Sequence, residues 1–436
     1  MSKYASTDPT TGTIVAKFET ESDEQVMASL SAADAAYRTW RTAEVAERAS
    51  VLQRVADLHR ERETELAELM TLEMGKPIAQ ARGEVKLSAS IFEYYATKGM
   101  DLLADEELDI AGSGRALVRT APIGALVGVM PWNFPYYQVA RFVAPNLLLG
   151  NTILLKHASN CPQQALAVEA MLRDAGSPEG VYRNIFSSSD QIADLIADPR
   201  IQGVSLTGSE RAGSIIGQLA GKYMKKAVLE LGGSDPFLVL AGADLGDAVA
   251  AAVPGRFGNA GQACTSSKRM IVDASVWDEF LDGFVSAAQS WSMGDPTDPA
   301  TRLGPMSSIG GRDEIAEQVA DAVSKGATVH LGGTVPDGDG AYYPATVLSG
   351  VTPDMRAYRE ELFGPVAVLH KVDSTDAAID LANDSPFGLG SAVFTTDDSE
   401  AAYVADRLDV GMVGINTTIK SAPDMPFGGV KTSGIG

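Results

Sequence analysis

One of the two cysteines in this 436-residue sequence lies in a stretch of small and polar residues, NAGQACTSSKR. A cysteine that only fills space usually lies among aliphatic side chains, where it behaves as a small hydrophobe. Cys264 instead follows Gly261, Gln262 and Ala263 and precedes Thr265, as an accessible thiol would. This setting favours a nucleophile, and a packing role is the alternative.

A cysteine nucleophile reacts as its thiolate, and a neighbouring general base can take the proton. The four histidines, His59, His157, His330 and His370, lie in no motif-like setting. A carboxylate is the other option, and KAVLELGGSDPF offers Glu230 at the end of an apolar strand. A glutamate between apolar residues can have a raised pKa that suits a general base. The alternative is a strand-end glutamate that faces solvent.

The segment VMPWNFPYYQ places Asn133 between Pro131 and Pro135. The two prolines fix a short rigid turn after a predicted strand. A rigidly held asparagine can direct its side-chain N–H at an oxyanion that develops during acyl chemistry. The alternative is a plain proline-bounded turn.

Two further strand ends carry groups that could hold a cofactor. SLTGSERAGSIIG places Thr207, Gly208 and Ser209 between a predicted strand and a predicted helix. Free N–H groups at a helix N-terminus bind anions such as a pyrophosphate, although this loop is not G-x-G-x-x-G. LLKHASN ends another strand with Lys156, which could contact cofactor hydroxyls or phosphate or simply face water.

The composition limits the class of protein. A chain of this length with 45% hydrophobic residues predicts two or three soluble domains. No apolar run is long enough to cross a bilayer, and the N-terminus lacks the apolar core of a signal peptide. Two cysteines fit the reducing cytoplasm. The formal net charge of −22 argues against nucleic-acid and membrane partners, and an acidic substrate would need a local basic residue.

Hydrophobic periodicity predicts the elements that position these residues. Residues 23–98 read as helices, and residues 115–130 read as a hairpin or neighbouring strands. Residues 137–240 and 235–416 alternate short strands with helices, which is typical of doubly wound α/β sheets. Because Cys264 lies near the start of the second block, we expect a site in the cleft between two domains.

The motifs PWNFP, LLKHASN, TGS, LELGG, GQAC, EELFGPV and PFGGVKTSGIG, in this order, resemble those of the aldehyde dehydrogenase superfamily across essentially the whole chain. The separations from Glu230 to Cys264, 34 positions, and from Cys264 to Glu361, 97 positions, are also similar to the family's. The resemblance implies an α/β fold with two doubly wound domains and a small β oligomerisation element. The cofactor-binding domain would comprise residues 1–114 and 131–230, the catalytic domain 231–416, and the oligomerisation or bridging segment 115–130 with 417–436.

The resemblance implies NAD(P)-dependent oxidation of an aldehyde to a carboxylic acid. Cys264 would attack the aldehyde carbon, and the Asn133 amide and the Cys264 backbone N–H would stabilise the oxyanion of the thiohemiacetal. Hydride would pass to the nicotinamide, and Glu230 would activate the water that hydrolyses the thioester. No metal is implied. The cofactor-binding positions of the family fall on Trp132, Asn133, Lys156, His157, Ala158, Ser159, Gly208, Ser209, Leu231, Glu361 and Phe363.

Within the superfamily, the chain looks like the members that oxidise succinate semialdehyde. Arg141 falls where they place a carboxylate-binding arginine, and Ser421 falls on a second substrate position. The alternative for Arg141 is a surface helix arginine. Some members have a further substrate arginine where this chain has Gly258, so a second carboxylate clamp is in doubt. Nearby basic residues in a different register are Arg256, Lys268 and Arg269.

The cofactor is expected to be NADP, with NAD also usable. The third residue after the LLK lysine is typically glutamate in strictly NAD-dependent relatives, where it would repel a 2′-phosphate. Here that residue is Ser159, which can donate a hydrogen bond to phosphate. The family continues beyond Gly436 with roughly a further strand that pairs with a partner subunit, and we expect a homodimer or homotetramer.

Three alternatives remain from the sequence. A broad-range or glutarate-semialdehyde dehydrogenase would use the same catalytic residues. A cysteine hydrolase without a cofactor is disfavoured by the cofactor positions. A non-catalytic binding or structural protein on the same fold is disfavoured by the intact Cys264, Glu230 and Asn133.

Overall fold

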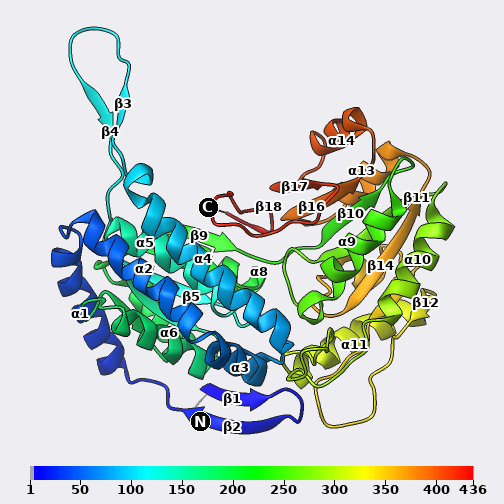
Figure 1. Cartoon of the computed structure of the whole chain (residues 1–436), viewed down its shortest axis with the longest axis horizontal. Coiled ribbons are helices and arrows are strands. Elements are labelled where there is room, and N and C mark those ends of the chain that lie inside the picture. Colours follow the sequence, from blue (N-terminus) through cyan, green and yellow to red (C-terminus); the bar gives the residue numbers. More distant parts are fainter. Residues whose placement is uncertain (1–3, 436) are drawn as a thin grey trace.

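Two mainly parallel sheets with helices on both faces form two lobes in the computed structural model, which describes residues 4–435 (Figure 1). The first lobe is built on a six-stranded sheet and the second lobe on a seven-stranded sheet. The expected α/β architecture with two doubly wound blocks is therefore confirmed.

The sheet of the first lobe has the order β19-β9-β8-β5-β6-β7, and only the edge strand β19 is antiparallel. Most of its strand residues are buried, because helices cover both faces of a parallel sheet and select continuous apolar runs. The strands are β5 (Ala125–Met130), β6 (Thr152–His157), β7 (Tyr182–Asn184), β8 (Ile201–Thr207), β9 (Lys226–Glu230) and β19 (Gly434–Ile435).

Helices of the first lobe form two hydrophobic clusters, one on each face of the sheet. The helices are α1 (Asp23–Trp40), α2 (Val45–Glu61), α3 (Glu63–Met74), α4 (Ile78–Leu102), α5 (Tyr137–Leu149), α6 (Pro162–Asp174), α7 (Ser189–Ala197) and α8 (Glu210–Lys222). The helices α1 to α4 cover the range 23–98 that was predicted to be helical, and α4 continues past it to Leu102. Gly75 ends α3 in the left-handed conformation, with φ 75°, which glycine adopts without a steric penalty.

The second lobe has the strand order β12-β13-β14-β11-β10-β16-β17, in which only β12 is antiparallel. Its strands are β10 (Asp235–Val239), β11 (Ser267–Asp273), β12 (Thr328–Leu331), β13 (Thr346–Ser349), β14 (Val366–Val372), β16 (Gly390–Phe394) and β17 (Met412–Ile415). Its helices are α9 (Leu245–Phe257), α10 (Trp277–Gln289), α11 (Ile309–Ser324), α12 (Arg356–Arg359), α13 (Thr375–Asn383) and α14 (Asp398–Ala405), with a 3₁₀ turn η1 (Gly258–Gly261).

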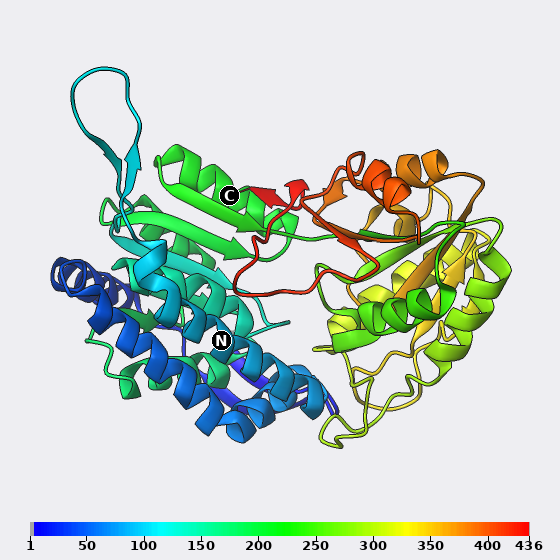
Figure 2. The same cartoon turned by 45° about the horizontal axis from the view of Figure 1, so that its top comes forward.

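Three small β pairs lie outside the two sheets. β1 (Tyr4–Asp8) pairs with β2 (Thr13–Phe18), and β15 (Phe387–Gly388) pairs with β18 (Val430–Lys431). β3 (Glu106–Leu108) and β4 (Ala116–Val118) form a hairpin arm that extends away from the first lobe (Figures 1 and 2).

The arm corrects one expected boundary. Residues 115–130 were expected to form one bridging segment, but β5 hydrogen-bonds to β6 and β8 in the middle of the first sheet. The run LVGVM is apolar enough for a fully buried parallel strand, which periodicity alone does not distinguish from a hairpin strand. The protruding hairpin begins earlier than expected, at Glu106.

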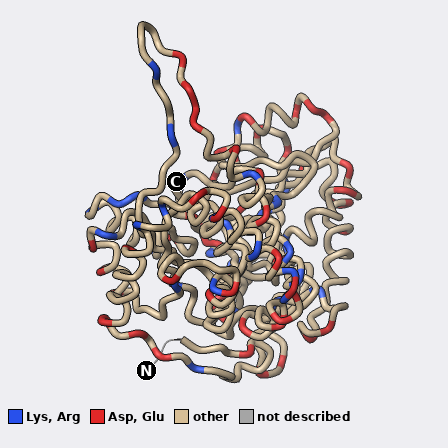
Figure 3. Tube along the Cα trace, turned by 60° about the vertical axis from the view of Figure 1, so that its left-hand side comes forward, with Lys and Arg blue, Asp and Glu red and all other residues tan. Residues whose placement is uncertain are grey.

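Acidic positions are spread along the whole trace rather than gathered in one region (Figure 3). On the hairpin arm they lie on the β3 side, at Glu106, Glu107 and Asp109, whereas the β4 side carries the basic residues Arg115 and Arg119. Within residues 4–435, none of the helices combines the length and the apolar character that crossing a membrane requires.

The packing of α2 against α4 gives a direct test of the first lobe. Leu52 on α2 is fully buried in the cluster that joins these helices to the sheet. Leu52→Ala should lower the free energy of unfolding by about 2–5 kcal/mol, because the apolar contacts are lost and a cavity remains. Urea unfolding followed by circular dichroism measures this change. Ser50→Ala, at an exposed position of the same helix, should change it by no more than about 0.5 kcal/mol. Equal effects of the two variants would contradict this packing.

Candidate active site

The expected site residues gather where the two sheets face each other edge to edge. In the first lobe they follow the carboxyl ends of strands: Asn133 follows β5, Ser209 follows β8, and Glu230 ends β9. In the second lobe they precede strands, because Cys264 lies just before β11 and Glu361 just before β14. The carboxyl edge of a doubly wound sheet is the usual ligand-binding edge, and here it is closed by the amino edge of the second sheet.

Two aromatic rings join the lobes at this junction. Trp132 of the first lobe and Phe363 of the second meet edge to face, with ring centroids 5.7 Å apart and an interplanar angle of 88°. Such T-shaped contacts are favoured by the ring quadrupoles. Both residues are among the expected cofactor positions, and the structure brings them together.

The turn that precedes the thiol has an unusual backbone. Asn259 and Ala260 have φ of 55° and 52°, and Gly261 has φ of 70°, so three successive residues are left-handed. For residues other than glycine this conformation costs about 1–3 kcal/mol each. Arg256, fully buried at the end of α9, holds the turn by donating to the carbonyl of Gly261 (3.3 Å) and to Ser266 Oγ (2.6 Å).

Asn133 is locked against this turn. Its side-chain Nδ2 donates to the Gln262 carbonyl at 3.0 Å, which uses one of its two N–H groups. Its own carbonyl accepts from Asn259 Nδ2 and from Lys76 Nζ, each at 2.9 Å. The expected rigid asparagine is therefore present, buried and fixed at both its backbone and its side chain.

A buried ion pair supports the Asn133 turn from behind. Lys76, which lies between α3 and α4, pairs with Glu84 on α4, and both side chains are almost fully buried. Glu84 Oε1 also accepts from the backbone N–H groups of Tyr136 (3.0 Å) and Tyr137 (3.2 Å) at the start of α5. A buried charge needs such partners, because an unpaired one is costly.

The two cysteines differ as the sequence predicts. Cys161 is fully buried, and burial raises its pKa well above the ordinary value. Cys264 is half-buried. Burial also raises the pKa of the Cys264 thiol, to about 11, while the charges of Lys268 and Arg141 oppose the rise. A thiol with this pKa is protonated in the free protein at neutral pH and needs a base to react.

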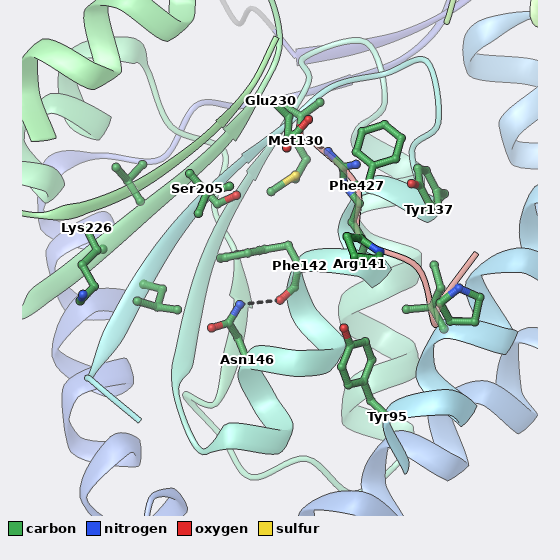
Figure 4. A pocket seen from close by; sticks show the side chains of 18 of the residues that line it. Tyr95, Met130, Tyr137, Arg141, Phe142, Asn146, Ser205, Lys226, Glu230 and Phe427 are labelled. Atoms are coloured by element: carbon green, nitrogen blue, oxygen red, sulfur yellow. Dashed lines mark hydrogen bonds between the residues drawn. The ribbon is translucent and has the colours of Figure 1, made fainter. Parts of the chain in front are cut away.

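Glu230 and Arg141 lie beside the same cavity of about 480 Å³ (Figure 4). Burial raises the pKa of Glu230, and the charge of Arg141 opposes that shift. Among residues 4–435, Glu230 Oε2 has no hydrogen-bond partner. The carboxylate is thus available to a water molecule or substrate, and its raised pKa suits a general base.

Arg141 projects from α5 into this cavity rather than into bulk solvent. Its guanidinium lies 4.7 Å from the ring centroid of Phe427 and 5.6 Å from that of Tyr137. Its Nη2 donates to Thr207 Oγ1 at 3.2 Å. An arginine held by aromatic faces retains N–H groups for a carboxylate.

The expected cofactor residues mostly meet at the junction. Ser209 caps the N-terminus of α8, and Gly208 precedes it, as the anion-site hypothesis requires. Glu361 accepts from the Gly233 N–H at 3.0 Å. A side chain at Gly232 would collide with the carboxylates of Glu210 and Glu361, so the glycine keeps this cradle open.

His157 is the exception among these positions. Its ring is buried, with Nε2 3.0 Å from the Pro135 carbonyl and Nδ1 accepting from the Ala158 N–H at 2.8 Å. The histidine side chain therefore positions the Asn133 turn and does not face the junction. Lys156 and Ser159, by contrast, are only half-buried at the end of β6.

Ser421 and the candidates for a second carboxylate clamp do not line the cavity of Arg141. Ser421 is half-buried in the loop between β17 and β18 but does not line the cavity of Arg141, although Ala422 does. Arg256 and Arg269 are buried and donate to backbone carbonyls, so neither acts as a second clamp. Lys268 is also buried.

Sequence reasoning missed the residues that hold the site. Lys76, Glu84, Asn259 and Gln262 have no catalytic signature, although Asn259 and Gln262 lie in the stretch NAGQACTSSKR that contains the nucleophile. The only hint in the sequence is that Asn259 and Gln262 are polar residues in the turn before Cys264. Nothing in a sequence distinguishes a buried lysine such as Lys76 from a solvated one.

Comparison with known proteins identifies the relatives of this arrangement. Residues 1–436 match the model described as the aldehyde dehydrogenase family. The chain is 51% identical, over 99% of its length and 91% of the relative's, to the NADP⁺ succinate-semialdehyde dehydrogenase of Deinococcus radiodurans. It is 45% identical to a protein of the same description from Mycobacterium ulcerans, with 99% and 95% covered. The succinic semialdehyde dehydrogenase of Streptococcus pyogenes, solved with NADP⁺, superposes with a TM-score of 0.97 at 40% identity and covers 99% and 95%.

The raised pKa of the nucleophile predicts the pH dependence of its reactivity. In the free protein, alkylation of Cys264 by iodoacetamide should keep accelerating from pH 9.0 to about 11, because only the thiolate reacts. The rate is measured by mass spectrometry of the peptide that contains Cys264, with circular dichroism as a check that the fold persists. A plateau below pH 9.0 would show that the thiol is not held in the protonated form.

Proposed function

The chain belongs to the aldehyde dehydrogenase family, and from this premise we propose that it oxidises succinate semialdehyde to succinate with NADP⁺. The observation that carries the proposal is the arrangement at the junction. A half-buried thiol follows a turn locked to Asn133, and the helix α5 that begins after Asn133 carries Arg141, which shares a cavity with Glu230. Relatives that carry this description support the choice of substrate and cofactor.

In the first step the Cys264 thiol gives its proton to a solvent water molecule, and the thiolate attacks the aldehyde carbon. A C–S bond forms, and the carbonyl π electrons move to oxygen to give a tetrahedral thiohemiacetal with an oxyanion. The second N–H of Asn133 Nδ2 and the backbone N–H of Cys264 stabilise this charge. Bound NADP⁺ supplies the acceptor for the hydride that leaves the same carbon.

The resulting thioester must then be hydrolysed. Glu230 takes a proton from a water molecule, whose oxygen attacks the thioester carbonyl and displaces the Cys264 thiolate. The unpartnered Oε2 and the raised pKa of Glu230 support this role. The oxyanion donors serve this step as well, since a second tetrahedral intermediate forms.

Several residues would hold the cofactor. Ser209 at the start of α8 and the preceding Gly208 suit the pyrophosphate. Glu361 suits the ribose next to the nicotinamide. Lys156 and Ser159 suit the adenosine ribose, and because no carboxylate stands at position 159, a 2′-phosphate is not repelled there.

Arg141 would bind the substrate carboxylate. Arg141 and Lys226 are the cations among the described residues that line the cavity, and Glu230 is the carboxylate. An acidic protein needs such a local positive charge to hold an anionic substrate. We propose Ser421 as the second substrate-binding residue, because it directly precedes Ala422, which lines the cavity.

The protein is further proposed to be a cytoplasmic homodimer or homotetramer. The hairpin arm of β3 and β4 exposes Leu108, Ile110, Leu117 and Val118. Exposed apolar side chains on a projecting hairpin are suited to packing against a second copy. The two free cysteines fit a reducing compartment.

The assignment of the nucleophile is tested by exchanging the two cysteines separately. Cys264→Ala should abolish NADP⁺-dependent oxidation of succinate semialdehyde, because no other thiol lies at the junction. Cys161→Ala is the matched control and should keep most of the activity, since Cys161 is buried elsewhere. The absorbance of the NADPH that forms in the steady state measures the activity of both variants. Comparable losses in the two variants would remove Cys264 from the mechanism.

The substrate is tested at Arg141. Arg141→Ala should raise KM for succinate semialdehyde roughly ten- to a hundredfold, since a charge-assisted pair contributes about 1.5–3 kcal/mol. KM for butyraldehyde, a neutral aldehyde of the same chain length, should change little. Equal effects on both aldehydes would mean that Arg141 does not bind the carboxylate, and a higher kcat/KM of the wild type for glutarate semialdehyde would favour the longer substrate.

A further inference from the structure

We propose that Lys268 orients and polarises the peptide group whose N–H forms half of the oxyanion hole, and is thus a positioning residue of the reaction. This inference rests on the function proposed above. Lys268 belongs to β11, four residues after the nucleophile, and its side chain is 1% exposed. It does not line the cavity of Arg141 and Glu230.

The Lys268 ammonium has three partners, one for each of its donors. Nζ lies 2.8 Å from the Ala263 carbonyl oxygen and 2.9 Å from the Cys264 carbonyl oxygen. The third partner is Glu361 Oε1, at 3.1 Å. A lysine that only neutralised a carboxylate would not need both carbonyls that flank the nucleophile.

The contact with Ala263 determines where the Cys264 N–H points. The Ala263 carbonyl and the Cys264 N–H belong to one peptide group, which is planar and trans, so they point in opposite directions. Lys268 draws the carbonyl toward the interior of the second lobe, and the N–H is directed away from it. Within residues 4–435, no group accepts a hydrogen bond from this N–H, which leaves it available to an oxyanion.

The charge of Lys268 acts in the same direction. A cation hydrogen-bonded to an amide oxygen polarises the amide and makes its N–H a stronger donor. The same cation lowers the pKa of the Cys264 thiol against the effect of burial. The other charged groups that influence this part of the site are Arg141, Asp235, Glu361, Glu210 and Arg269. Lys268 is the one of these that touches the peptide group itself.

Other groups help to hold the loop, but none of them replaces this contact. Ser266 N also donates to the Ala263 carbonyl, at 3.2 Å, and Arg256 holds the carbonyl of Gly261. The Ser266 N–H carries no charge, and Arg256 binds the Gly261 carbonyl rather than the peptide group between Ala263 and Cys264. Loss of Lys268 should therefore leave the turn formed but free to rotate this peptide.

Two reagents separate the oxyanion hole from the thiol, and neither needs the cofactor. With p-nitrophenyl acetate, Cys264 Sγ bonds to the acetyl carbon, an oxyanion forms and collapses, and p-nitrophenolate leaves with the electron pair of the broken C–O bond. With iodoacetamide, Sγ displaces iodide at a saturated carbon, and no oxyanion forms. The ratio of the acylation rate to the alkylation rate therefore measures the oxyanion hole after correction for the reactivity of the thiol.

Lys268→Met should lower this ratio about tenfold or more, since loss of one oxyanion donor costs about 10²–10³ in rate. Arg269→Met is the matched control: this neighbouring buried cation donates to the carbonyls of Ser234, Leu381 and Ala382 and should leave the ratio within about twofold. Lys268→Gln keeps a donor without the charge, and an intermediate ratio is expected. It also provides the test if Lys268→Met does not fold.

An unchanged ratio in a folded Lys268→Met or Lys268→Gln variant would overturn the inference, as would an equal fall in Arg269→Met. Cys264→Ala serves as the blank for both reagents. Acylation that persisted in Cys264→Ala would contradict the proposed nucleophile instead, so failure of the inference and failure of the proposed function give different results.

Discussion

The backbone carbonyl of Asn133 joins the two lobes at the site, because it accepts from Lys76 Nζ in one lobe and from Asn259 Nδ2 in the other. The Asn133 side chain closes the contact by donating to the Gln262 carbonyl. Cys264 and Asn133 belong to different lobes, so the distance between them depends on these hydrogen bonds. A displacement of the lobes by about 1 Å would be enough to weaken an arrangement of this kind.

The buried charged side chains near the site hold backbone segments in place. The Lys76–Glu84 pair holds the start of α5, Arg256 holds the left-handed turn, and Lys268 holds the nucleophile. Buried ion pairs add little net stability, since desolvation offsets their attraction, but their partners must stay in place because an unpaired buried charge is costly. The first and second lobes thus each supply a buried lysine next to one of the two groups that we propose as oxyanion donors.

Much of this structure follows from the sequence. The alternation of apolar runs predicted both parallel sheets and nearly all of their strands, because a sheet covered on both faces selects such runs. The residue types and spacing pointed to Cys264, Glu230 and Asn133, and the structure places them at the junction. The role of β5 was not predicted, since its apolar run fits either a hairpin or a central strand. The supporting lysines and the inward ring of His157 were not predicted either, because burial of a polar side chain depends on tertiary packing that a single sequence does not reveal.

The central claim is that the reaction passes through a thioester on Cys264. It is tested most directly by mixing Glu230→Gln with succinate semialdehyde and NADP⁺, quenching in acid and determining the adduct by peptide mass spectrometry. Glu230→Gln should still form the thioester but hydrolyse it slowly, because the base that activates water is missing. The account predicts one succinyl group on the peptide that contains Cys264 and none on the peptide that contains Cys161. The absence of any adduct during NADPH formation, or an adduct on another residue, would contradict it.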